Sequence, residues 1–261
     1  MLKVKDFLNS VARLKWAKDN GCHWEPQTCA QATRSGRLEV LQWARENGCD
    51  WETSTCAEAA KGGHLEVLQW ARRNGCPWEE EEDLQCDWDY ETSLDCCALA
   101  ARGGHLAVLM WLRALECPCV NSTCAAAAEG GHLEVLTWAR EDGCPWEENI
   151  EDDGNWDCCA LAAAGGHLEV LRWLRKHDCP WDDMTCAGAA AGGHIEVLQW
   201  AREQHCPWGE WTCAWAAEGG HTEVLQWARE HHCPWNHLTR QLAEQNGHLE
   251  LLQWAVEHGA P

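Results

Sequence analysis

The feature that most constrains this chain is an internal repeat with a period of 27 residues. The stretch "GGHLEVLQWARRNGCPW", residues 62–78, recurs in near-copies along most of the sequence. A fixed period of this kind is typical of solenoids, in which small supersecondary units stack on one another. One tryptophan marks the same place in every copy: Trp16, Trp43, Trp70, Trp111, Trp138, Trp173, Trp200, Trp227 and Trp254.

The tryptophan frame divides the chain into nine repeats, which start at residues 1, 28, 55, 96, 123, 158, 185, 212 and 239. Two steps are longer than 27 residues because of insertions near residues 79–95 and 147–157, which are acidic and each carry a tryptophan. Solenoids tolerate extra residues in loops, so we expect both insertions to be loops. The frame predicts a single repeat domain over residues 1–261.

Each repeat is expected to begin with a short helix of small residues. In the third repeat, Cys56, Ala59 and Ala60 fall at i, i+3 and i+4, which gives a narrow face suited to close helix contact. Thr55 stands just before them and is expected to cap the helix, because its hydroxyl can accept from an unpaired backbone amide. The same expectation holds for the threonines at 28, 123, 185, 212 and 239.

A second helix is expected to follow the glycine pair of each repeat. In the third repeat, Gly62 and Gly63 make the turn, and the helix runs from His64 to about Asn74. Gly75 and a proline then end it. Because no repeat contains a convincing period-two strand, the sequence predicts an all-α solenoid of stacked helix–turn–helix repeats.

The segment from Thr55 to Trp78 resembles the ankyrin repeat. Residues 59–68, "AAKGGHLEVL", are similar to that family's A-A-x-x-G-H-x-x-V-V core, and Gly75-Cys76 stands where the family has Gly-Ala. The resemblance extends over the whole chain apart from the insertions, although the period is shorter than the family's roughly 33 residues. It implies an ankyrin-like stack that binds a protein partner through its concave side.

The recurring histidines and cysteines have a structural and a chemical interpretation. Each histidine follows Gly-Gly and is expected to start a helix and to bond to backbone in its own or the next repeat; Arg37 holds that place in the second repeat. Neighbouring histidines would stand roughly 10 Å apart, too far to share one metal ion. The cysteines form two ladders that suit buried thiols, and they lack C-x-x-C spacing.

Some sequence features favour the chemical interpretation of these residues, and a zinc- or redox-responsive protein stays open as an alternative. They are the neighbouring pairs Cys96-Cys97 and Cys158-Cys159, and the stretch from His231 to Cys233. The recurring tryptophans are interpreted as packing between neighbouring repeats. Trp211 and Trp215 lie outside both tryptophan ladders, which draws attention to them.

Charge and composition exclude several classes of function. The chain has 42 acidic and 20 basic residues, a net charge of −22, which repels phosphate backbones and anionic lipid. We therefore expect no nucleic-acid or membrane partner and a protein partner that is basic. The sequence shows neither a secretory leader nor a stretch long enough to span a bilayer, so an intracellular location, cytoplasmic or nuclear, is expected.

No pattern of catalytic or ligand-binding residues stands out from the repeat. The chain has no glycine-rich phosphate loop after a strand, no H-E-x-x-H motif and no nucleophile–base signature. We therefore expect a non-enzymatic monomer without catalytic, cofactor-binding or metal-binding residues.

Positions that differ between repeats are the candidates for meeting a partner. The fourth and seventh positions of the first helix vary most and lie three residues apart, so they share one helix face. In this interpretation, basic residues in the early repeats select a partner by its charge, and apolar residues in the later repeats anchor it. The alternative is neutral drift at exposed positions. The predicted partner-binding residues are Arg34, Glu58, Lys61, Leu99, Arg102, Leu161, Trp211, Trp215 and Leu242.

The sequence thus favours a protein–protein interaction scaffold that binds through the first-helix face. A substrate-recognition adaptor of a larger complex, such as a ubiquitin ligase, is the alternative within binding proteins. Because residues 1–8 fit the first repeat frame, we expect no recruitment domain in this chain.

Overall fold

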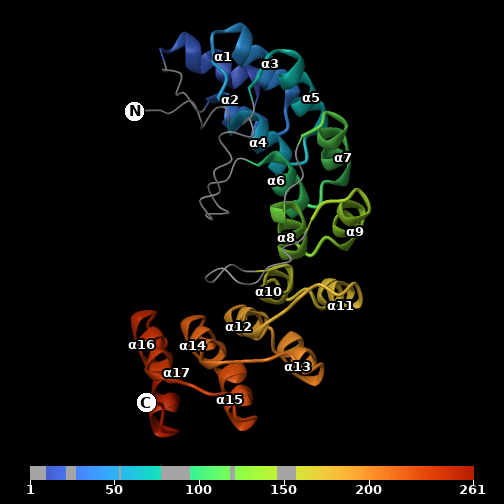
Figure 1. Cartoon of the computed structure of the whole chain (residues 1–261). Helices are drawn as coiled ribbons and strands as arrows, with labels where there is room; N and C mark the ends of the chain where they lie inside the picture. The colour runs from blue at the N-terminus through green and yellow to red at the C-terminus, as the bar shows by residue number, and fades with distance from the viewer. Residues whose placement is uncertain (1–9, 22–27, 53, 78–94, 118–120, 146–156) are drawn as a thin grey trace. The chain divides into compact units, whose positions relative to one another are not determined.

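The structure is a computed structural model, which describes residues 10–21, 28–52, 54–77, 95–117, 121–145 and 157–261. All regular secondary structure in these segments is helical, and the helices follow one another as short antiparallel pairs (Figure 1). The expectation of an all-α chain of helix pairs is therefore confirmed. Both acidic insertions fall almost entirely outside the described residues.

The helices cluster into two compact units, Met1–Cys119 and Val120–Pro261. A single domain over the whole chain therefore remains a prediction. The first unit holds α1 (Val11–Asp19), α2 (Thr28–Arg34), α3 (Leu38–Glu46), α4 (Ser54–Lys61), α5 (Leu65–Arg73), α6 (Cys96–Arg102) and α7 (Leu106–Ala114). The second holds α8 (Asn121–Glu129), α9 (Leu133–Glu141), α10 (Cys158–Ala164), α11 (Leu168–Lys176), α12 (Asp183–Ala191), α13 (Ile195–Glu203), α14 (Glu210–Glu218), α15 (Thr222–Glu230), α16 (His237–Gln245) and α17 (Leu249–Glu257).

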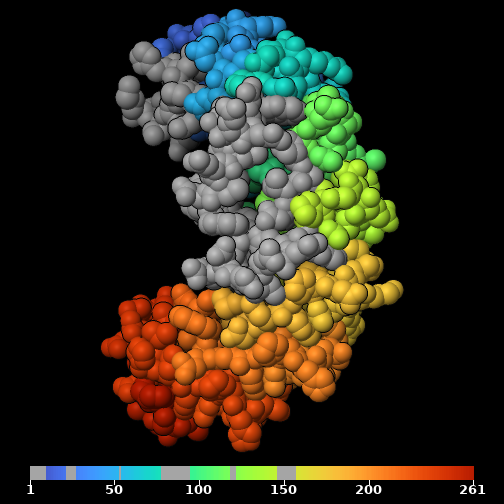
Figure 2. All heavy atoms as spheres, in the orientation of Figure 1, coloured from blue at the N-terminus to red at the C-terminus, as the bar shows by residue number. Residues whose placement is uncertain are grey.

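Within each unit the first helices of the repeats form one layer and the second helices form another. In the second unit, α10, α12, α14 and α16 make the first-helix layer, and Figure 2 shows the repeats of this unit packed into a continuous body. The first helices lie closer to one another than the second helices do. A stack with this asymmetry curves toward its first-helix side.

Small side chains allow the first helices to approach closely. Cys186, Ala189 and Ala190 of α12 are fully buried, as Cys56, Ala59 and Ala60 of α4 are. At Gly188, a Cβ atom would stand 2.6 Å from the carbonyl oxygen of Ala160 on α10, so only glycine fits at this spacing. The predicted small-residue face is therefore the contact between neighbouring first helices.

The first helices begin earlier than the sequence predicted. Thr185 lies inside α12, and the cap is Asp182, whose carboxylate accepts from the Met184 amide. In the third repeat, the amide of Glu52 donates to the Thr55 hydroxyl at 3.3 Å, so this threonine reaches back toward the residue that precedes the helix. The prediction of threonine N-caps was wrong. These threonines recur because they are buried within the helix, and not because they cap it.

Histidines that start second helices join their repeats to the preceding ones, as seen for His64, His105, His167, His221 and His248. The Nε2 atom of His64 donates to the Arg34 carbonyl at 3.2 Å, and His221 makes the same bond to the Ala191 carbonyl at 2.9 Å. The His64 ring also fills the space beside Gly62, where a Cβ atom would lie 2.6 Å from the ring. The helix-start position is confirmed, but the bond goes to the preceding repeat rather than to its own or the next.

The tryptophans pack between neighbouring repeats, as expected. Trp181 meets Trp200 of the following repeat edge to face, with ring centroids 6.0 Å apart. Trp181 also stacks on Arg175 of its own repeat, whose guanidinium lies 4.3 Å from the ring centroid and donates to the Cys179 carbonyl. The same arginine contacts recur in other repeats, so this arginine is a structural residue that our sequence interpretation had overlooked.

Candidate functional site

In the second unit, the open face of the first helices carries an apolar stripe. We define this apolar stripe as Met184 on α12, Trp211 and Trp215 on α14, and Leu238 and Leu242 on α16. Trp211 is 46% exposed, and the other four side chains are half-buried. Among the described first helices, Trp211 is the one large apolar residue that is exposed.

Two adjacent indoles form the centre of the apolar stripe. Trp211 and Trp215 are one helical turn apart on α14, and their ring centroids are separated by 5.9 Å with an interplanar angle of 45°. Neighbouring aromatic rings in this arrangement support each other's orientation. The two rings together form an apolar surface whose side chains are held in place by each other. Aromatic anchors of this kind contribute much of the binding energy at protein interfaces.

Acidic side chains border this aromatic pair. Glu210 and Glu218 lie at the two ends of α14 and are exposed, and Asp183 stands at the start of α12. Glu210 accepts a hydrogen bond from the Asn236 side chain at 2.5 Å, which links α14 to the residue that caps α16. The surroundings are therefore electrostatically complementary to a basic segment.

The first unit presents a charged first-helix face. Arg34 and Glu58, on the consecutive first helices α2 and α4, form an ion pair of 3.3 Å. Lys61 is exposed at the end of α4, and Arg102 is half-buried at the end of α6. These four predicted residues therefore come from three successive first helices, and two of them contact each other.

Two of the predicted residues are not on an open surface. Leu99 and Leu161 hold the fourth position of α6 and α10, and each is only 8% exposed. The expectation that this position is open in every repeat is corrected here. It fails because the first helices approach closely enough to bury a residue of moderate size between them.

The structure adds Met184 and Leu238 to the candidate site. Both hold the position that Trp211 holds in its own repeat, one residue before the buried threonine. Position-by-position comparison would have found them if it had begun one residue before the threonine. In a frame that starts each repeat at the threonine, this position falls at the end of the preceding repeat, where its place on the first helix is hidden.

The cysteine and histidine clusters have structural explanations. Among the described residues, no group of three or more His, Cys, Asp or Glu side chains is placed to hold a metal ion. Cys158 stands where other repeats have the buried threonine, and Asp157 caps α10 by accepting from the Ala160 amide at 2.6 Å. In the His231–Cys233 stretch, the His231 ring stacks on Trp227 at 4.2 Å.

Asp157 is the described carboxylate with the most perturbed acidity. Burial raises the pKa of Asp157 to about 7, and the hydrogen bond from the Ala160 amide opposes this rise. The electrostatic effect of Cys179 adds to the rise. Because its carboxylate accepts from the Ala160 amide at the start of α10, we assign Asp157 to helix capping.

Comparison with known proteins agrees with the helix-pair architecture. Residues 124–175 match a family model described as ankyrin repeats (many copies). No curated protein matches the chain. In the described part of the chain, none of the helices has both the length and the apolar character needed to cross a bilayer.

The matched residues cover two helix pairs of the second unit, α8 to α11, and the same helix pairs, turns and histidine bonds recur in the other repeats. Proteins of this family generally serve as protein–protein interaction modules. Over residues 124–175 the chain is therefore similar to the ankyrin repeat proteins.

Proposed function

We propose that this protein is a non-enzymatic scaffold that binds a protein partner through the apolar stripe of the second unit. The observation that carries the proposal is the exposed Trp211 beside Trp215, on a helix layer whose inter-helix contacts are made by small, buried residues. Exposed tryptophan costs free energy in water, and an interaction module gains that energy when the ring is covered.

The partner should present an apolar side chain next to basic residues. The indole pair supplies the apolar contact, and Glu210, Glu218 and Asp183 supply negative charge around it. The charge of the whole chain, −22, favours encounter with a basic partner and disfavours an acidic one. A monomeric chain in an intracellular compartment fits this proposal.

The first experiment identifies the partner by site-specific crosslinking. A photoreactive amino acid replaces Trp215, and in the matched control it replaces Trp16 on α1, which is 48% exposed and lies on a second helix. The account expects one protein to crosslink at position 215 and not at position 16. Equal labelling at both positions would show that the capture is not specific to the apolar stripe.

The second experiment measures affinity for the captured partner. Replacing both Trp211 and Trp215 by Ala should weaken binding by at least about tenfold, because aromatic anchors of this type contribute more than about 1–2 kcal/mol each. The Trp16→Ala control should bind as the wild type does. Unchanged affinity in the double variant, with its helix content intact, would refute the proposed site.

A further inference from the structure

Pairs of cysteines recur at a constant separation of twenty residues. The first member lies near the start of a first helix, and the second follows the end of the second helix of the same repeat. The pairs are Cys29 and Cys49, Cys56 and Cys76, Cys97 and Cys117, Cys124 and Cys144, Cys159 and Cys179, Cys186 and Cys206, and Cys213 and Cys233.

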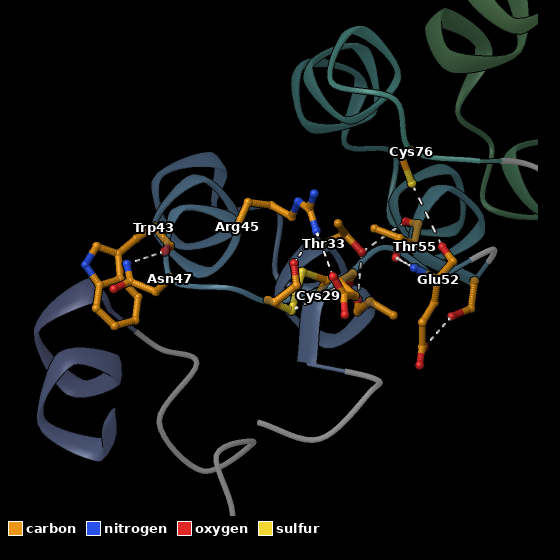
Figure 3. Close-up of a disulfide and its surroundings, with 12 residues drawn as sticks. Cys29, Thr33, Trp43, Arg45, Asn47, Glu52, Thr55 and Cys76 are labelled. Atoms are coloured by element: carbon orange, nitrogen blue, oxygen red, sulfur yellow. Dashed lines mark hydrogen bonds and ion pairs between the residues drawn. A yellow bond between two sulfur atoms is a disulfide. The ribbon is translucent and has the colours of Figure 1, made fainter. Parts of the chain in front are cut away.

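The pair in the second repeat is closed. Cys29 and Cys49 form a disulfide, with their Cα atoms 6.3 Å apart (Figure 3). This separation lies within the usual range of about 4.4–6.8 Å for disulfides. The helix pair therefore brings these two positions within bonding distance in its folded form.

Other repeats hold the same two positions as a dithiol. The thiol of Cys56 donates a hydrogen bond to the sulfur of Cys76, and the same contact joins Cys213 to Cys233. It also joins Cys97 to Cys117, Cys159 to Cys179, and Cys186 to Cys206. Cys144 is itself disulfide-bonded while Cys124 is a thiol, so their repeat is left out of this set.

We propose that each of these five dithiols is a modification site, at which a small-molecule disulfide closes a bridge between the first helix and the end of the second helix of one repeat. The closed Cys29–Cys49 pair shows the product state at equivalent positions. This inference goes beyond protein binding and does not depend on the apolar stripe.

The reaction is thiol–disulfide exchange in two steps. The thiolate of the second cysteine attacks one sulfur of the small-molecule disulfide, forms a mixed disulfide and releases one small thiolate. The first cysteine then loses its proton and attacks the protein sulfur of the mixed disulfide, which expels the second small thiolate. Two protein thiols are oxidised to one disulfide, and one small-molecule disulfide is reduced to two thiols.

Cys117 and Cys179 show why the second cysteine of a pair can take the first step. The hydrogen bond from Cys97 lowers the pKa of Cys117, while burial and the charge of Asp95 oppose this effect. The hydrogen bonds from Cys158 and Cys159 lower the pKa of Cys179 to about 4. A lowered pKa keeps more of the sulfur as thiolate, which is the attacking form.

Access to the reagent should set the order of closure. Among the described free cysteines, Cys117 alone is half-buried, and the others are buried. A reagent in solution reaches Cys117 first, whereas the remaining pairs need local opening of a repeat. We therefore infer that Cys97–Cys117 closes before the other four dithiols.

Disulfide mapping of the folded full-length chain tests this inference. The chain is incubated with graded ratios of oxidised to reduced glutathione, free thiols are alkylated, and the disulfides are located by peptide mass spectrometry. The expected first new bridge is Cys97–Cys117, followed by bridges that all join cysteines twenty residues apart. Apart from the bridge that Cys144 already forms, bridges at other separations in the folded chain, or no Cys97–Cys117 bridge when Cys29–Cys49 is fully closed, would overturn it.

Two variants sharpen the test. With Cys97→Ala, Cys117 should stop at the mixed disulfide with glutathione, because the resolving thiol is gone. With Cys158→Ala, the Cys159–Cys179 bridge should still form, because Cys158 is not at the twenty-residue position, but it should form more slowly, because one of the two hydrogen bonds that lower the pKa of Cys179 is lost. Loss of that bridge in a folded Cys158→Ala chain would contradict the pairing, and the wild-type map stands even if a variant fails to fold.

A second readout is the rate of proteolysis. Each bridge closes a loop within one repeat and so restricts its local unfolding. The oxidised chain should be cleaved about tenfold or more slowly than the fully reduced chain. Equal cleavage rates, with the bridges confirmed by mapping, would show that they do not join the two helices of a repeat productively.

Discussion

At the scale of single residues, the side chains that seemed most chemical serve the packing of the repeats. His64 bonds to the Arg34 carbonyl of the preceding repeat, and Trp181 meets Trp200 of the following one. A substitution at such a position would break a contact between two neighbouring repeats. This explains why the same residues recur along the chain. Constancy in this chain therefore marks structure rather than catalysis.

The buried cap Asp157 should make stability depend on pH. Its pKa is raised to about 7 from the ordinary 3.8, mainly by burial. A raised carboxyl pKa adds stability that is fully present below about 4 and is lost as the pH rises through about 7. Asp157→Asn keeps the acceptor for the Ala160 amide and removes this loss, so at pH 8 it should be more stable than the wild type by roughly 2–4 kcal/mol.

Urea unfolding of both proteins from pH 4 to 8 measures this effect. The difference in unfolding free energy between Asp157→Asn and the wild type should grow as the pH rises and level off above about 7. All other titrating groups are common to the two proteins and cancel in the difference. Parallel stability curves would mean that burial does not hold the proton on Asp157.

A second residue-scale prediction concerns the left-handed turn after the second helix. Gly75 takes this conformation in the third repeat, but His205, at φ 63°, takes it after α13. The left-handed region costs a non-glycine residue about 1–2 kcal/mol of strain in the folded state. Glycine avoids this strain, but part of the gain is lost because glycine has more conformational freedom in the unfolded state. His205→Gly should therefore stabilise the protein by about 0.5–1 kcal/mol.

Gln204 provides the matched control for this prediction. It precedes His205 and has an ordinary φ of −86°. Gln204→Gly should destabilise the protein, because glycine there adds only unfolded-state freedom. Thermal unfolding of the two variants decides the matter, and a change of the same sign in both would remove the turn as the explanation.

At the scale of elements, the contact between successive repeats rests on the fit of a histidine ring against a glycine pair. Gly62 has an ordinary backbone conformation, so its need for glycine comes from the His64 ring, which a Cβ atom would meet at 2.6 Å. Gly63 has φ +71°, and there a side chain would be strained for that reason too. Each turn thus accepts the ring of its own histidine and that of the next repeat.

A double-mutant cycle tests this fit. Gly62→Ala alone should destabilise the protein by roughly 1–3 kcal/mol, because the ring must shift and its bond to the Arg34 carbonyl weakens. The same change made in a His64→Ala background should cost much less, since the ring is absent. The coupling free energy, taken from urea unfolding of the four proteins, should be at least about 1 kcal/mol. If the losses of stability from Gly62→Ala and His64→Ala are additive, the His64 ring is not the source of the strain at position 62.

The elements also show which parts of the fold a sequence can reveal. The turns, both helices and the stacking tryptophans were predictable, because identical residues recur in phase. The helix starts were not, since the caps Asp182, Gly209 and Asn236 differ from repeat to repeat while the threonine inside the helix is constant. A constant residue looks like a boundary even when its constancy comes from burial.

The candidate site was only partly predictable for a related reason. Trp211, Trp215 and Leu242 could be found because they vary against a fixed background. The burial of Leu99 and Leu161 could not, because it depends on how closely the first helices approach, as at Gly188 against Ala160. The spacing between first helices depends on the packing of two repeats, so the sequence of a single repeat does not reveal it.

At the scale of the whole molecule, the chain is a set of near-identical repeats whose constant positions hold neighbouring repeats together. Stability in such proteins is approximately a sum of terms for single repeats and their contacts. A change at a constant position should therefore weaken the stack, whereas a change on the apolar stripe should leave it intact. This division between stacking and binding residues is the central claim of the account.

Thermal unfolding of Trp200→Ala and Trp215→Ala tests that division most directly. Trp200 is half-buried and packs against Trp181, so its loss should cost roughly 2–3 kcal/mol and lower the melting temperature by several degrees. Trp215→Ala should change the melting temperature by no more than about 2 °C. Comparable losses in the two variants would contradict the account, because the open stripe would then be part of the stack.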